Sequence, residues 1–204
     1  FIARLGTTPV AGHQIAVNMV SMMFMVPLAL GSATSTLVAQ SVGAGAHVDA
    51  RRLGWHGLVI GSGLAAVLGA VVYLPREAVL GLYTQDPTII AAALPLIAWL
   101  VVFHVADAAQ TVAAFVLRAF KIATVPMVIY VAALWGVGLG GGYLLAFDVS
   151  GTVPPGLQGA RGFWMASTVG LLLAASALSG FMLYGFGQLR REHAERPAMR
   201  GPSH

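Results

Sequence analysis

One acidic residue, Asp107, lies within a long apolar stretch of the sequence. Its nearest charged neighbours in the chain are Asp86 and Arg118. A carboxylate at the centre of a bilayer costs about 2.5–3.5 kcal/mol on insertion scales, so such a residue normally faces a cavity or a partner. Asp107 is therefore a candidate to exchange a proton, bind a sodium ion or hold an organic cation. A structural carboxyl that hydrogen-bonds a neighbouring helix is the alternative that the sequence leaves open.

Helical spacing places aromatic and polar side chains beside this acid. Two aromatic and two polar residues share its face: Trp99, Phe103, Gln110 and Thr111. His104 lies one turn before the acid, where it could orient Asp107, relay protons or merely fill a polar gap. Arg118 is about 16 Å away along a helix, too far to neutralise the carboxylate directly. An acid framed by aromatic rings, with no fixed cation beside it, suits a sodium ion, a proton or a lipophilic cation.

A second group of polar residues lies near the start of the chain. His13, Gln14, Asn18 and Ser21 follow one another at short spacing, and the last three share one helical face. Such side chains can line a cavity, or they can join membrane helices by hydrogen bonds, and both interpretations remain open. His13 and His56 are isolated. The sequence contains no catalytic constellation and no metal-ligand cluster, so we expect neither an enzyme nor a cofactor.

The composition excludes a soluble protein. Of 204 residues, 58% are hydrophobic and 9% are charged, whereas a soluble domain has about 25% charged residues. The mean hydropathy is +0.83. These side chains cannot form a water-facing surface, so we expect an all-α integral membrane protein.

The intervals between charges predict its architecture. A membrane helix needs about 20 predominantly apolar residues, and five stretches qualify: residues 10–42, 53–74, 88–117, 122–147 and 163–188. Residues 1–5 resemble the stub of a sixth helix, and Pro27 predicts a kink in the first span. Residues 75–83 predict a short interfacial helix. The transmembrane part ends at about residue 189, and residues 190–204 form a polar tail.

The basic residues predict the orientation. With the tail in the cytoplasm, eight basic residues lie inside: Arg51, Arg52, Arg118, Lys121, Arg190, Arg191, Arg196 and Arg200. Three lie outside: Arg4, Arg76 and Arg161. This asymmetry follows the positive-inside rule. The same residues account for the sequence pI near 10, so no nucleic-acid partner is expected.

Three motifs in the sequence resemble helices of one known family. They are AGHQIAVNMVSMMFMVPLALGSATSTLVAQSVGAG (residues 11–45), ADAAQTVAAFVLRAF (residues 106–120) and GARGFWMASTVG (residues 159–170). They are similar, in this order, to the eighth helix, the end of the tenth helix with its acid, and the start of the twelfth helix of the multidrug and toxic compound extrusion (MATE) family of transporters, especially its NorM-like branch. The resemblance extends over residues 1–189, in the family's order and spacing.

The resemblance implies a fold and a function. The chain would be the C-terminal six-helix lobe of a twelve-helix antiporter whose N-terminal lobe lies outside this sequence. Such a protein would export organic cations, drugs and toxic compounds across the bacterial inner membrane, driven by sodium ions or protons. The family's coupling acid corresponds to Asp107, and its cavity residues correspond to Gln14 and Asn18. Phe103 replaces an aromatic hydroxyl, and the family's other coupling acid would precede Phe1, so the coupling ion stays undecided.

Two other functions remain open. A flippase for lipid-linked precursors has a related architecture, but it should line its cavity with Arg or Lys to bind phosphates, and the spans contain neither. A structural subunit of a membrane complex is the second alternative, and it predicts that Asp107 is replaceable.

Overall fold

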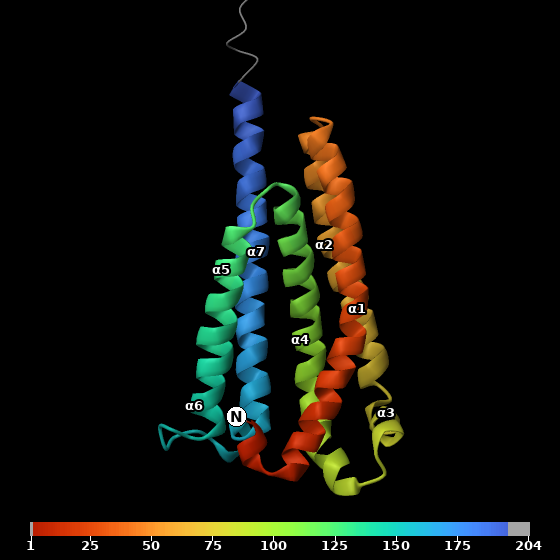
Figure 1. Cartoon of the computed structure of the whole chain (residues 1–204), viewed down its shortest axis with the longest axis vertical. Coiled ribbons are helices and arrows are strands. Elements are labelled where there is room, and N and C mark those ends of the chain that lie inside the picture. The colour runs from red at the N-terminus through yellow and green to blue at the C-terminus, as the bar shows by residue number, and fades with distance from the viewer. Residues whose placement is uncertain (1, 196–204) are drawn as a thin grey trace, which may run out of the picture.

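The computed structural model in Figure 1 describes the backbone of residues 2–195 and the side chains of residues 2–184. Within these residues it contains helices and no strands, which confirms the all-α class. Five segments are long and apolar enough to cross a membrane: α1 (Thr7–Gly43), α2 (His47–Tyr73), α4 (Pro87–Ala119), the Thr124–Ala146 segment, and α7 (Ala160–Glu195), of which residues Ala160–Tyr184 qualify. The shorter elements are η1 (Ile2–Leu5), α3 (Arg76–Tyr83) and η3 (Pro155–Leu157).

The fourth span is not one regular α-helix. It consists of α5 (Thr124–Val131), η2 (Ala132–Gly141) and α6 (Gly142–Ala146). The middle part, η2, is a π-helix. In a π-helix each backbone carbonyl accepts a hydrogen bond from the N–H group five residues later, so each turn is wider than in an α-helix. The sequence predicted a single span over residues 122–147, with no sign of this wider segment.

The ends of the spans also differ from the sequence-based expectation. The structure extends α7 to Glu195, so the first part of the expected polar tail, residues 190–195, is helical. The rest of that tail, residues 196–204, lies outside the described residues. The expected interfacial helix is present as α3, and α1 continues through Pro27.

Helix α4 occupies the centre of the bundle. Helices α1, α2 and α7 pack against it, and the α5–η2–α6 span packs against α7 on the far side (Figure 1). Buried apolar residues on α4 fall into two clusters. Leu96 and Leu100 pack with Ala16 and Trp164 in one, and Val112 packs with Leu178 in the other. Any group on α4 can therefore affect three neighbouring helices.

Small residues allow these helices to approach closely. A Cβ atom added to Gly12 on α1 would lie 3.1 Å from the backbone nitrogen of Ala93 on α4. One added to Gly61 on α2 would lie 3.0 Å from Val112. Lipid is as apolar as the helix surfaces, so such contacts must supply packing that the hydrophobic effect supplies in water.

The start and end of α4 are fixed by local chemistry. Asp86 caps its N-terminus, where the carboxylate accepts hydrogen bonds from the hydroxyl and backbone N–H of Thr88, the latter at 2.8 Å. These bonds hold the pKa of the Asp86 carboxyl below its usual value.

After α4, Lys121 adopts a positive φ of 62°, and its N–H donates to the carbonyl of Arg118. The chain thereby reverses direction into α5.

Candidate functional site

A cavity of about 280 Å³ lies among η1, α1, α4 and α7. Its walls are mostly aromatic and aliphatic, and the lining residues are Ile2, His13, Val17, Val20, Ser21, Phe103, Phe163, Trp164 and Ser167. No acidic residue, Arg or Lys is among them. Of the residues that the sequence singled out, Phe103, His13 and Ser21 face this cavity.

Three rings from three helices meet at its wall. The indole Nε1–H of Trp164 on α7 donates to Nδ1 of His13 on α1, at 3.2 Å. The Phe103 ring on α4 meets Trp164 edge to face, with centroids 5.7 Å apart and planes at 67°. The His13 ring stands at 68° to the same indole. This aromatic cluster (His13, Phe103 and Trp164) joins α1, α4 and α7, so the expectation that His13 is isolated is wrong.

Asp107 is partly buried on α4, one turn beyond Phe103. It lines neither this cavity nor the second one described below. Among the described residues, no side chain forms a hydrogen bond or ion pair with it. Tyr130 on α5 is near enough to interact with its charge. Arg118 is exposed and stacks 5.2 Å from the centroid of the Phe115 ring, so it leaves the carboxylate without a fixed cation.

His104 is fully buried, with an exposed fraction of 0%. Among the described residues, neither of its ring nitrogens has a hydrogen-bond partner. It lies on α4 one turn beyond Leu100, which belongs to a buried apolar cluster. A buried polar group without a partner is uncommon in native structures.

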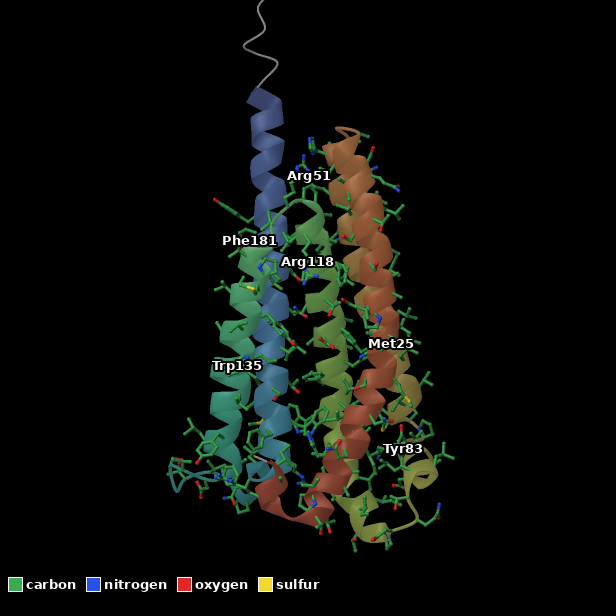
Figure 2. The ribbon with its side chains drawn as sticks, viewed as in Figure 1. Met25, Arg51, Tyr83, Arg118, Trp135 and Phe181 are labelled. Carbon is green, nitrogen blue, oxygen red and sulfur yellow. The ribbon has the colours of Figure 1, made fainter. Side chains whose placement is uncertain are left out.

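The remaining predicted residues are scattered. Gln110 and Thr111 are buried within the bundle, where the Thr111 hydroxyl donates to Oε1 of Gln110 at 3.4 Å. Gln14 faces a second cavity of about 330 Å³ between η1, α1, η2 and α7. Asn18 accepts a hydrogen bond of 3.1 Å from the hydroxyl of Tyr83, which lies on α3 at one end of the bundle (Figure 2). Trp99 packs against the apolar cluster around Leu100.

Sequence reasoning did not find Trp164, Ser167 or Tyr130. Each lies on a helix other than the one that carries Asp107, and helical spacing relates only residues of the same helix. The signal available for Trp164 was its place in the GARGFWMASTVG motif. No group of three or more His, Cys, Asp or Glu side chains that could hold a metal occurs among the described residues.

The five long apolar helices define the class of protein: a multi-pass α-helical membrane protein. The MatE family model matches residues 1–144, and the chain belongs to this family. It is 39% identical over 183 residues to the probable multidrug resistance protein NorM of Aromatoleum aromaticum, covering 90% of this chain and 39% of that protein. It is 38% identical over 177 residues to the multidrug resistance protein PmpM of Pseudomonas aeruginosa, covering 87% of this chain and 36% of that protein.

The fold has a solved counterpart. The crystal structure of the eukaryotic MATE transporter AtDTX14 superposes with a TM-score of 0.79 and 23% sequence identity, covering 93% of this chain and 41% of that one. The chain therefore spans about two fifths of the length of the relatives that it matches. The family predicted from the three sequence motifs is confirmed.

Proposed function

We propose that this chain is the C-terminal lobe of a cation-coupled antiporter that exports lipophilic organic cations and other drugs across the bacterial inner membrane. Sodium ions or protons are the coupling ions, and Asp107 is the residue that binds them. One observation carries the proposal: a carboxylate without a partner lies inside a membrane span, one turn from a cavity walled by aromatic rings. The similarity to proteins named multidrug resistance proteins supports the same function.

The positions of Asp107 and the cavity favour indirect coupling. Antiport needs the ion and the drug to favour different conformations, because a ligand shifts an equilibrium only through differential affinity. The simplest arrangement has both ligands compete for one carboxylate. Here Asp107 lies outside the cavity lining, whereas Phe103 on the same helix lies within it. The effect of ion binding therefore travels along α4, which packs against α1, α2 and α7.

The cavity lining favours drug export over the alternatives. A flippase for lipid-linked precursors needs cationic side chains to bind phosphate groups. In the part of the chain that the structure describes, neither cavity has an Arg or Lys in its lining. A purely structural subunit would have no use for an unpaired carboxylate within a span, which costs free energy to insert.

The first prediction is that Asp107→Asn in the whole transporter abolishes ethidium efflux driven by an ion gradient. Asparagine keeps the volume of the side chain but cannot become charged, so it can neither release a proton nor neutralise a bound sodium ion. Efflux is measured from energised vesicles, with the amount of protein matched by immunoblot. Imposing the sodium and proton gradients separately identifies the coupling ion.

Asp86→Asn is the matched control. It makes the same chemical change on the same helix, at an exposed N-cap where asparagine caps as well as aspartate. This variant should transport at the wild-type rate. If Asp107→Asn also retains the wild-type rate and its dependence on the ion gradient, Asp107 is not the coupling residue.

A further inference from the structure

We propose that the 280 Å³ cavity binds planar aromatic compounds that carry a hydrogen-bond acceptor, and that the Nε2–H group of His13 is the donor. The inference rests on the proposed function, because it names a class of substrate for that lobe. It assigns to His13 and Trp164 a role that the sequence motifs did not indicate.

The hydrogen bond from Trp164 determines which nitrogen of His13 carries the proton. An indole N–H can only donate, so Nδ1 of His13 must accept. A neutral imidazole has one N–H and one acceptor nitrogen, and a charged imidazole has no acceptor at all. His13 is therefore neutral, with its proton on Nε2. Among the described residues it forms no other hydrogen bond.

The Nε2–H group is available to a ligand. His13 is only partly buried and lines both cavities. Its Nε2 atom is not among the buried, unpartnered nitrogens, unlike both nitrogens of His104. The hydrogen bond from Trp164 to Nδ1 thus fixes the tautomer of His13. Its Nε2–H group is left as a donor with a preset orientation. A preorganised donor reduces the entropic cost of binding.

The rest of the wall offers flat aromatic surfaces. The Phe103, Phe163 and Trp164 rings offer area for stacking or edge contacts. The two lining hydroxyls are Ser21 and Ser167, and Ser21 already donates to the carbonyl of Val17 at 2.8 Å. Among the described residues, no charged side chain lines the cavity, so recognition there depends on aromatic area and on one acceptor of the ligand.

The volume limits the size of the ligand. Drug-binding pockets generally measure about 300–1,000 Å³, and this cavity of about 280 Å³ lies just below that range. Three fused six-membered rings make a suitable probe. Acridine and anthracene have the same shape and differ only where a ring nitrogen replaces a C–H group, so the pair isolates the contribution of one acceptor.

The experiment measures the affinities of radiolabelled acridine and anthracene for the whole transporter in lipid nanodiscs, at a pH where acridine is neutral. Binding to empty nanodiscs is subtracted. We expect acridine to bind about fivefold more tightly than anthracene, the contribution of one net hydrogen bond. The difference should vanish in His13→Phe, which retains a ring but lacks the donor. His13→Gln should restore part of it, because the amide can donate from a similar position.

Three further variants separate the donor from its surroundings. Trp164→Phe removes the bond that fixes the tautomer, so the preference for acridine should decrease without disappearing. Ser167→Ala should leave it unchanged, as should His56→Phe, the same substitution at an exposed histidine of α2. All variants are first checked for aggregation by size-exclusion chromatography. If His13→Phe aggregates, His13→Gln takes its place, and the preference for acridine should then decrease without disappearing.

The outcomes also distinguish this inference from the proposed function. Ethidium efflux in His56→Phe should stay near the wild-type rate, because His56 is exposed and lines neither cavity, whereas Asp107→Asn abolishes efflux if the proposed function holds. Equal affinities for the two probes in the wild-type protein would overturn the inference, even if efflux depends on Asp107. A preference for acridine that persists in His13→Phe, or that is lost in Ser167→Ala, would also overturn it.

Discussion

At the scale of single residues, His104 and His13 show two ways of placing a histidine in a membrane helix. His13 has a partner in Trp164 and faces a cavity, whereas His104 is fully enclosed and both of its nitrogens lack partners. A buried polar group without a hydrogen bond forfeits about 1–3 kcal/mol. In this conformation His104 therefore lowers the stability of the bundle.

The second prediction follows from that cost. His104→Leu should raise the thermal unfolding temperature of the whole transporter, because leucine suits the apolar surroundings of α4 and leaves no unpaired nitrogen. His104→Ala should not raise it, since it leaves a cavity, and its effect on ion-driven efflux should be milder than that of Asp107→Asn. Unfolding is measured in detergent, with His56→Leu as the exposed control. A lower unfolding temperature in His104→Leu would show that the imidazole has a stabilising partner.

Only part of the candidate site could be predicted from the sequence. Asp107 could be identified from the sequence because charged residues are rare in these spans, and a single acid in an apolar stretch is visible without a structure. The bond between His13 and Trp164 joins residues 151 positions apart. Helical spacing relates only residues on one helix, so neither this bond nor the nearness of Tyr130 to Asp107 could be predicted. The coupling role of Asp107 and the other assigned roles stay predictions.

At the scale of elements, the contact between η2 and α7 depends on the absence of side chains. A Cβ atom on Gly170 of α7 would lie 2.7 Å from the carbonyl oxygen of Ala133 and 3.2 Å from the backbone nitrogen of Gly138. Both atoms belong to the backbone of η2 and cannot rotate away. The many glycines of residues 136–142 are typical of close approach or bending, but they do not predict a π-helix, because that form depends on which backbone groups pair.

The third prediction compares two glycines of α7. Gly170→Ala should force η2 away from α7 and lower the stability of the transporter by about 1–3 kcal/mol, as overpacking generally does. Gly180→Ala is the matched control, since a Cβ at Gly180 has nothing within 4 Å. Alanine favours the helix there by about 1 kcal/mol. Thermal unfolding of both variants, in parallel, provides the comparison. Equal unfolding temperatures would mean that the contact between η2 and α7 is not tight.

In the molecule as a whole, five long apolar stretches were enough to predict five membrane spans, since a bilayer admits few other structures. The central place of α4 was not predictable, because it depends on which apolar faces meet. The structure places Arg51 and Arg118 at one end of the bundle and Tyr83 at the other (Figure 2). Arg76 lies on the same short helix as Tyr83, so basic residues occur at both ends of the bundle, and the side of the membrane stays a prediction.

The fourth prediction concerns that orientation. A cysteine introduced at Ala46, between α1 and α2, should react with an impermeant thiol reagent only after the cytoplasm is opened. A cysteine at Thr84, between α3 and α4, should react in intact cells. The natural sequence contains no cysteine, so each label reports one site, although any further part of the protein must first be freed of cysteine. The reverse pattern of labelling would overturn the orientation inferred from the positive-inside rule.

The last prediction is that residues 1–204 alone confer no drug resistance. Alternating access generally requires one bundle of helices to rock against another around a shared site. The described residues form a single bundle around α4, and the chain spans 39% of its Aromatoleum aromaticum relative. A chimaera that joins the preceding part of that relative to this chain should restore ethidium resistance in a susceptible strain. The same chimaera with Asp107→Asn should fail, which ties the restored activity to this lobe. Resistance from residues 1–204 expressed alone would refute the proposal that the chain is one lobe of a two-lobed transporter.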